Sequence, residues 1–466
     1  MRYNSPATQL VLVAITVILA TGTRRLLGNY LMQWTPENEN LAYNRYLPAG
    51  ITACLSGFVG IFLVNLIGFR YIFVFYTITN IIYASSILVI YQYGTHSFHS
   101  GAMILTIIGY YPSRVATLVI VLAYPGEKWK SRALAAFLLI EYLASTIGDI
   151  ITVRSLGHSN ASQRYGYAIA YLCVSCFVPF VALGIAPSHQ IVRNNGVYLL
   201  SPETNFKTEI RETAKLFTTR HMLLLLPYMY SYPMLFALAN MQLPDAALFV
   251  MYDVGKIFIL FTGQLLDVQW ASRRVRGLVT FALLLVFFAI SLGMTTAVRV
   301  YKYDLTGIDL SWPQDKISSF VVNAVVTQQR PLLKAVLFFA GIVTGMTEMF
   351  GYWVMGTLTN DLKSSARFVG TYHSIMAIGG LVGFQVGKNV GIFHPATVGY
   401  YTATALTIVS FILLFFVVRR IPETNNWSLG SITGGNELFD TASDKSAEII
   451  ATIIDVKHHH THPSQA

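Results

Sequence analysis

Five ionisable residues lie inside otherwise apolar stretches of the sequence, where their chemistry could matter most. They are Arg114, Glu141, Asp253, Lys256 and Glu348. A charged side chain at the centre of a bilayer costs at least ~2.5 kcal/mol on insertion scales, so an ionisable residue in the middle of a membrane span is by default a functional candidate. These five residues are therefore our candidates for a substrate and proton pathway.

Each of these residues needs a way to avoid an isolated charge in lipid. Asp253 and Lys256 are three residues apart, so on one helix they can pair and neutralise each other. Glu141 and Glu348 have no opposite charge on their own helical faces, and each needs a partner on another helix, a water-filled cavity or a proton. Arg114 is a candidate partner for Glu141, or a ligand for an anionic substrate group. The sequence does not choose between paired structural residues and a proton carrier.

The elements that must position these residues are membrane-spanning helices. The chain has 466 residues, of which 54% are hydrophobic and 12% charged, whereas ordinary soluble proteins carry roughly 25% charged residues. Its mean hydropathy is +0.54. Apolar runs of roughly 20 residues, enough to cross ~30 Å of hydrocarbon, recur along the chain. This composition excludes a soluble fold and predicts an all-α integral membrane protein.

Twelve runs are long and apolar enough to be transmembrane helices. They are residues 8–27, 48–66, 70–92, 101–123, 133–152, 166–187, 222–241, 245–266, 275–298, 334–357, 369–391 and 397–418. The long connection after the sixth run divides them into two sets of six. The predicted domains are an N-terminal half at 1–187, a linker at 188–221, a C-terminal half at 222–420 and a polar, disordered tail at 421–466.

Two segments within this plan differ from the regular transmembrane runs. In the linker, residues 204–218 have the pattern of an amphipathic helix lying on the inner membrane surface. Phe206, Ile210 and Phe217 lie near one face of that helix. The first apolar run is short and is followed by two arginines, a pattern that a cleaved signal peptide also has.

The formal net charge of +10 is explained by orientation in the membrane. Lys and Arg lie in short clusters between the apolar runs and are more frequent in the loops on the side of the N-terminus. The positive-inside rule then predicts that both termini are cytoplasmic, and nucleic acid is not an expected partner. The sequon at Asn160 falls on an outer loop, so Asn160 is a glycosylation candidate. Neither the plasma membrane nor an endomembrane is favoured.

The sequence carries no motif that is typical of an enzyme. It has no phosphate-binding glycine loop, nucleophile elbow or metal-spaced set of cysteines and histidines. Its three cysteines lie in apolar stretches and cannot form a disulfide framework. We therefore expect no enzymatic activity, no cofactor and no metal site. The expected partners are the lipid bilayer and a small solute.

Several loops resemble those of known transporters. The two halves with a long central inner loop resemble the major facilitator superfamily, and the turn from Asn65 to Arg70 is similar to its Gly/Arg turn in shortened form. The segment Gly263 to Asp267, followed by Arg273 and Arg274, occupies the equivalent place in the second half.

Two further segments are more specific. The loop Tyr124-Pro125-Gly126-Glu127-Lys128-Trp129-Lys130-Ser131-Arg132 resembles the Y-P-x-E-K-x-K-x-R loop of fungal UNC-93-like proteins. Residues 352–356, 360–361 and 366–372 resemble the Y-W-x-M-G, N-D and A-R-F-x-G-x-Y segments of the same group. The resemblance covers about residues 3–422.

This resemblance implies a major facilitator fold with gating motifs on its inner loops. The residues at the matching positions are Asn65, Gly68, Arg70, Glu127, Lys128, Arg132, Asp267, Arg273, Asn360, Asp361 and Arg367. The implied function is secondary transport of a small solute by alternating access, with proton coupling through a carboxyl such as Glu141 or Glu348. At Glu141-Tyr142 the sequence departs from the group, where an Asn-containing F-N is more usual. Since the group includes trafficking partners and channel regulators, the alternative is a non-transporting accessory protein that binds another membrane protein.

Overall fold

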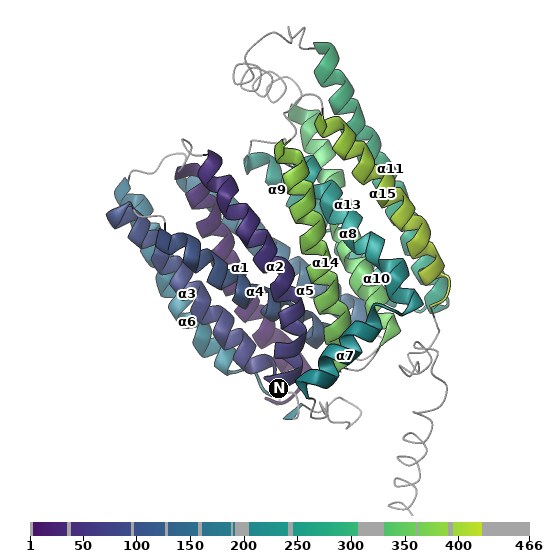
Figure 1. Cartoon of the computed structure of the whole chain (residues 1–466), viewed down its shortest axis with the longest axis horizontal. Helices are drawn as coiled ribbons and strands as arrows, with labels where there is room; N and C mark the ends of the chain where they lie inside the picture. The colour runs from purple at the N-terminus through teal and green to yellow at the C-terminus, as the bar shows by residue number, and fades with distance from the viewer. Residues whose placement is uncertain are drawn as a thin grey trace, which may run out of the picture.

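In the part of the chain that the structure describes, the regular elements are α-helices, as the sequence predicts (Figure 1). The computed structural model describes residues 3–34, 39–94, 97–125, 129–156, 161–187, 190–191, 205–240, 246–305, 330–359, 362–389 and 395–421. Two bundles of helices lie side by side, one drawn in purple to blue and the other in teal to yellow in Figure 1.

The described residues of the first bundle form six helices. They are α1 (Pro6–Trp34), α2 (Glu39–Leu66), α3 (Phe69–Tyr93), α4 (Ser97–Ala123), α5 (Lys130–Leu156) and α6 (Ala161–Leu183). Within it α3 packs against α4 and α6, and α1 packs against α5.

The second bundle follows a short helix, α7 (Phe206–Leu216), that lies in the predicted linker. Its helices are α8 (Arg220–Asn240), α9 (Ala246–Lys256), α10 (Ile259–Asp267), α11 (Arg273–Leu305), α13 (Arg330–Leu358), α14 (Leu362–Asn389) and α15 (Pro395–Val418). Helix α8 packs against both α14 and α15, and α13 packs against α9 and α11.

The helices have the length and composition of membrane spans. Among the described residues, eight helices are long and apolar enough to cross a bilayer, namely α2, α3, α4, α5, α6, α11, α13 and α15. Large apolar side chains such as Phe177 and Phe180 are exposed on the outside of α6. An exposed apolar surface of this kind belongs in lipid rather than in water, so the protein is a multi-pass integral membrane protein in contact with the bilayer.

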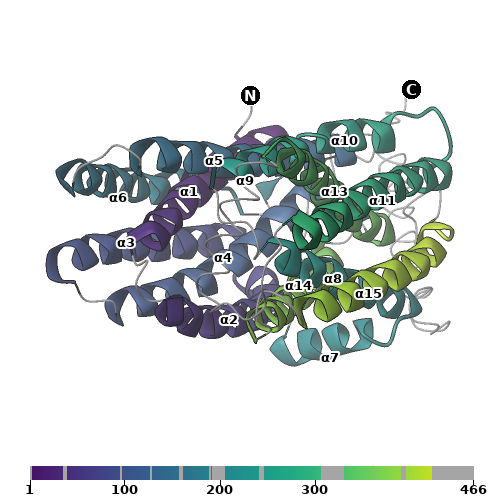
Figure 2. The same cartoon turned by 90° about the horizontal axis from the view of Figure 1, so that it is seen from above.

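Two reciprocal pairs of helices lie in the contact between the bundles, which α4 and α14 extend. Figure 2 shows α5 beside α9 on one flank and α2 beside α14 on the other, and α5 also contacts α10. Counted along the chain, the second span of each half therefore meets the fifth span of the other half. This reciprocal contact is what a two-fold relation between the halves produces.

The predicted span at 245–266 is not one continuous helix. The structure breaks it into α9 and α10, and residues 257–258 form the junction. There the amide of Ile257 donates to the carbonyl of Val254 at 3.2 Å and the amide of Phe258 to that of Gly255 at 3.2 Å. These are the tighter bonds of a 3₁₀ turn, which often marks a hinge within a helix. Because the segments on both sides of the break are apolar, the sequence does not reveal it.

Close packing of α14 against α8 provides a test of this arrangement. A Cβ atom on Gly379 would overlap the carbonyl oxygen of Tyr230, whereas one on the neighbouring Gly380 would meet nothing within 4 Å. We expect Gly379→Ala to lower the free energy of unfolding by about 1–3 kcal/mol, because the two helix backbones must move apart. The matched Gly380→Ala should be neutral or slightly stabilising, since alanine favours a helix. Thermal unfolding in detergent measures both, and equal stabilities would contradict the packing.

Candidate functional site

Arg114 lies between two buried carboxylates from different helices. Its guanidinium on α4 contacts the carboxylate of Glu141 on α5, and its Nη2 lies 2.6 Å from Oε1 of Glu348 on α13. All three side chains are buried. Glu141 and Glu348 thus find in one residue the counter-charge that their own helices lack. Because Glu348 belongs to the second bundle, Arg114 also joins the two halves by an ion pair.

Tyr142 extends this contact toward the second candidate pair. Its hydroxyl donates to Oε2 of Glu348 at 2.5 Å, and the Nζ of Lys256 lies 4.5 Å from the centre of its ring. Lys256 also lies 4.2 Å from the ring centre of Tyr252 and 2.8 Å from Oδ1 of Asp253. The lysine ammonium is therefore held by one carboxylate and two aromatic faces, which attract cations.

The structure thus brings all five candidate residues into one connected set. We call Arg114, Glu141, Asp253, Lys256 and Glu348 the central cluster. Its members come from α4 and α5 in the first bundle and from α9 and α13 in the second. Lys256 is the last residue of α9, so the cluster lies directly beside the break in that helix.

Two further polar residues of the second bundle reach the cluster. The hydroxyl of Tyr352 lies 3.3 Å from Oε1 of Glu348 and 3.2 Å from Nε2 of His373 on α14. Glu348 and Tyr352 are four residues apart on α13, a spacing that places them on one helical face. The sequence points to Tyr352 by this spacing and by its place in the Y-W-x-M-G segment, whereas His373 lies near the start of the predicted span 369–391 and well inside the observed α14. The chain Glu348–Tyr352–His373 links the cluster to α14.

We call the end of the molecule at which α7 lies the linker side. Two contacts join the halves there. In the first, Asp267 at the end of α10 accepts hydrogen bonds from the backbone amides of Ser131 at 3.1 Å and Arg132 at 2.7 Å. These amides lie in the first turn of α5, where free N–H groups and the helix dipole favour a carboxylate. Asp267 therefore caps a helix of the opposite bundle.

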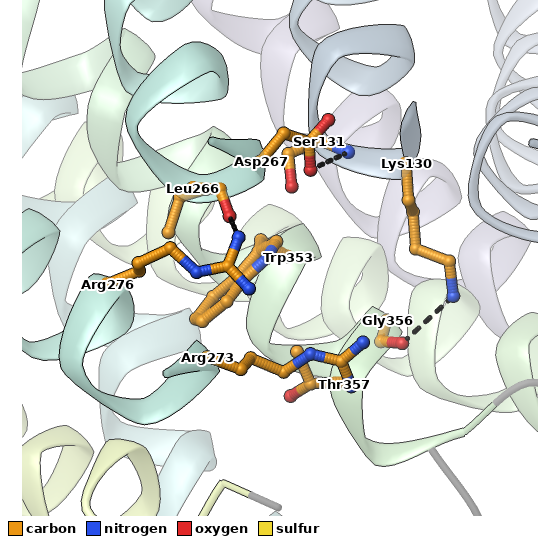
Figure 3. Close-up of a pocket in the computed structure, with 9 residues that line it drawn as sticks. All are labelled: Lys130, Ser131, Leu266, Asp267, Arg273, Arg276, Trp353, Gly356 and Thr357. Carbon is orange, nitrogen blue, oxygen red and sulfur yellow. Dashed lines mark hydrogen bonds between the residues drawn. The ribbon is translucent and has the colours of Figure 1, made fainter. Parts of the chain in front are cut away.

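A small polar pocket adjoins this cap (Figure 3). Its wall includes Lys130, whose Nζ donates to the carbonyl of Gly356 at 3.2 Å, and Arg276, which donates to the carbonyl of Leu266. Arg273 also lines the pocket. Lys130 and Arg276 thus bind carbonyls near the ends of α13 and α10.

The loop that leads from α4 to this pocket is buried at its start. Tyr124, just beyond the end of α4, is 2% exposed, and its ring packs edge-on against Phe69 at 6.4 Å. Burial raises the pKa of the Tyr124 hydroxyl well above its usual value. Tyr124 is therefore a neutral packing residue at the start of the motif that identifies this loop.

In the second contact, a buried glutamate on α7 binds both bundles. Glu209 is 0% exposed, and its two oxygens accept from Nε and Nη2 of Arg367 on α14 at 2.6 and 2.8 Å. The side-chain amide of Asn65 at the end of α2 donates to the same carboxylate at 2.7 Å. We call Asn65, Glu209 and Arg367 the linker latch, because the helix between the halves holds one residue from each.

The latch corrects one feature of the predicted linker helix. The amphipathic pattern of residues 204–218 predicts that Glu209 belongs, with Lys207 and Arg211, to the polar remainder of that helix. The structure instead turns Glu209, Thr213 and Leu216 toward the bundles and buries them. Local periodicity cannot reveal this, because the partner Arg367 lies 158 residues away.

Two residues predicted at the inner turn of the first half stay within that half. Arg70 donates from Nε to the carbonyl of Ile185 at 2.7 Å, just beyond the end of α6. Gln9 binds the same segment, since its side-chain oxygen accepts from the amide of Ala186 at 2.8 Å. Gly68 has a φ of 88°, a left-handed conformation that glycine adopts without strain. Arg70 therefore fastens α3 to the segment that follows α6, and within the described part of the chain this contact stays inside the first half.

Several predicted residues lie outside the part of the chain that the structure describes. They are Glu127, Lys128, Asn160, Asn360 and Asp361. The described residues contain no group of three or more His, Cys, Asp or Glu side chains that could hold a metal ion.

No family model matches the chain, but several proteins are similar to it in sequence. UNC93-like protein 1 of Arabidopsis thaliana is 25% identical over 448 residues, which cover 91% of this chain and 92% of that protein. An UNC93-like protein of Schizosaccharomyces pombe is 23% identical over 404 residues, or 83% and 77% of the two chains. A notoamide biosynthesis cluster protein of Aspergillus versicolor is 22% identical over 359 residues, 71% of each chain. The predicted resemblance to UNC-93-like proteins is confirmed.

Solved structures of transporters have the same fold. The fucose:proton symporter FucP of E. coli has a TM-score of 0.55 at 13% identity and covers 89% of this chain and 98% of its own. The proton:xylose symporter XylE of the major facilitator superfamily has a TM-score of 0.59 at 12% identity, with coverages of 90% and 96%. The predicted major facilitator fold is confirmed.

The linker latch can be tested by removing its carboxylate. We expect Glu209→Gln to lower the free energy of unfolding by about 3–5 kcal/mol, because it leaves the guanidinium of Arg367 buried without its counter-charge. Replacing both residues, as Glu209→Met with Arg367→Met, should recover much of that loss. The control is Glu212→Gln on the same helix. Its partner Lys215 is 45% exposed, so the cost should stay below about 1 kcal/mol.

Thermal unfolding of the purified full-length variants measures this series. If Glu209→Gln melted at the same temperature as Glu212→Gln, the latch would have no role in holding the halves together.

Proposed function

We propose that this chain is a secondary transporter that moves a small solute by alternating access and exchanges a proton at the central cluster. The observation that carries the proposal is the central cluster itself. It unites ionisable residues of both bundles around Arg114, at the interface along which the halves of a major facilitator protein must move.

The charges of the central cluster would be balanced by one added proton. Glu141, Glu348 and Asp253 contribute three negative charges, while Arg114 and Lys256 contribute two positive charges, which gives −1 when all are ionised. An unbalanced charge is costly in a membrane interior. A proton on one carboxyl removes it, and Glu141 and Glu348 compete for the same arginine.

Protonation of Glu348 would act directly on the contact between the halves. The ion pair between Arg114 and Glu348 crosses from one bundle to the other, whereas that between Arg114 and Glu141 stays within the first. A proton on Glu348 weakens the crossing pair and leaves Arg114 bound to Glu141. The proton would therefore destabilise the conformation in which Arg114 binds Glu348 relative to one in which the two residues are apart. A coupled transporter needs such a difference in free energy between its two conformations.

Other features support movement about this cluster. The break between α9 and α10 lies beside Lys256, and discontinuous helices at the midplane are typical of transporter binding sites. On the linker side, the halves are joined by the cap at Asp267 and by the linker latch. Both contacts consist of hydrogen bonds and ion pairs, which can open and re-form. The structural neighbours FucP and XylE are described as proton symporters.

The second candidate function is that of an accessory protein bound to another membrane protein. The observation in its favour is that Arg114 already contacts two carboxylates, so its charge is satisfied without a substrate. The two functions differ in a simple measurement. A transporter should be stabilised by its solute, whereas an accessory protein should co-purify with a stoichiometric membrane partner.

We predict that Glu348→Gln abolishes solute-driven proton movement, because the amide keeps the shape of the side chain but cannot exchange a proton. Purified protein would be reconstituted in vesicles that enclose a pH-sensitive dye and exposed to sugars, amino acids, organic anions and metal ions from about pH 5 to about pH 8. Wild type and the control Glu212→Gln, whose side chain is only 25% exposed but lies outside the central cluster, should change the internal pH with one class of solute. Glu348→Gln should give the signal of empty vesicles.

Solute binding, measured as a rise in melting temperature, serves as the check on folding for each variant. A Glu348→Gln protein with unchanged proton movement at every pH would reject the coupling role. Absence of any solute response in wild type, together with a stoichiometric partner, would favour the accessory function.

A further inference from the structure

Helix α7 has an outward face that the linker latch does not use. The face toward the bundles contains Glu209, Thr213 and Leu216. On the outward side Phe206 is 54% and Ile210 is 46% exposed. Next to this apolar pair run three basic residues at four-residue spacing, which places them in one stripe along the helix. This basic stripe is Lys207, Arg211 and Lys215, all exposed.

The position of α7 sets the depth of this surface in the membrane. Its Phe206 packs against Phe62 of α2 with ring centres 5.1 Å apart, and Phe217 packs near Phe58 at 6.2 Å. The apolar part of α2 ends at Leu66. At ~1.5 Å of rise per residue, these contacts lie within roughly 6–12 Å of the linker-side end of that span. Figure 1 shows α7 at this end of the molecule, beside α2 and α14.

This depth corresponds to the boundary between acyl chains and headgroups. A helix in that plane carries apolar side chains toward the acyl chains and basic side chains toward the phosphates. The charged groups on the outward face are the three cations of the basic stripe and Glu212, which pairs with Lys215 at 2.7 Å. The face therefore has a net charge of +2 from three cations and one carboxylate.

We propose that the basic stripe of α7 binds the anionic headgroups of the linker-side leaflet. Polybasic helices next to a membrane attract anionic lipids in this way. Because Glu209 lies on the opposite face of the same short helix, bound headgroups hold the linker latch against both bundles. Anionic lipid thus stabilises the state in which the linker side is joined. This inference does not depend on transport, since it concerns how α7 is held.

The test compares wild type with Lys207→Gln/Arg211→Gln/Lys215→Gln and with a matched triple variant. The control Arg274→Gln/Arg419→Gln/Arg420→Gln removes three exposed cations that lie beside the ends of α11 and α15. Each full-length protein would be placed in nanodiscs of phosphatidylcholine alone or with phosphatidylserine. Hydrogen–deuterium exchange of the peptide that covers residues 205–217 then reports how firmly α7 is held.

We expect phosphatidylserine to slow exchange of α7 in wild type and in the control. The α7 variant should lose this response, since each charge removed near an anionic surface weakens binding about fivefold. Equal exchange in both lipids for wild type, or equal loss of the response in the two triple variants, would overturn the proposal. If the triple variant failed to fold, Arg211→Gln alone would be compared with Arg274→Gln, and an undiminished response in Arg211→Gln would again overturn it.

Discussion

A charge within the membrane must be neutralised, and in this protein the required partners come from opposite halves. Glu348 finds its cation, Arg114, on the other bundle. Separating the halves at this level would strand a charge in the membrane interior, which is costly unless the carboxylate gains a proton or another cation. Packing of α5 against α9 and of α2 against α14 surrounds this contact. In the proposed transport mechanism, protonation of the central cluster would therefore control the contact between the two bundles.

The linker side is held by a different kind of contact. Asp267 caps α5 through two backbone amides, and Glu209 binds one side chain from each half. In both cases a single carboxylate serves as the common acceptor. The first contact joins α10 to α5, and the second joins α2 to α14 through α7. The two contacts therefore fasten the two reciprocal helix pairs at the same end of the molecule.

Much of this arrangement could be predicted from the sequence, where a local rule was enough. Apolar runs located the helices, and the three-residue spacing predicted the pairing of Asp253 with Lys256. Burial of Glu209 could not be predicted, because on its own helix it has the same polar surroundings as Glu212. The role of Arg70 also depends on tertiary contacts, since its acceptor follows α6 by two residues. The break at residues 257–258 could not be predicted from hydropathy, because both flanking segments are apolar.

The order in which the cluster residues are synthesised has a consequence for biogenesis. Domains generally fold in order from the N-terminus as the chain is made. Arg114 and Glu141 belong to adjacent helices and emerge together, whereas Glu348 follows Arg114 by 234 residues. The early pair is already neutral, so α4 and α5 can leave the translocon without waiting for the second half. When α13 is inserted, Arg114, the cation that pairs with Glu348, is already in the membrane. We therefore expect the cation that Glu348 needs to be in place before α13 is inserted.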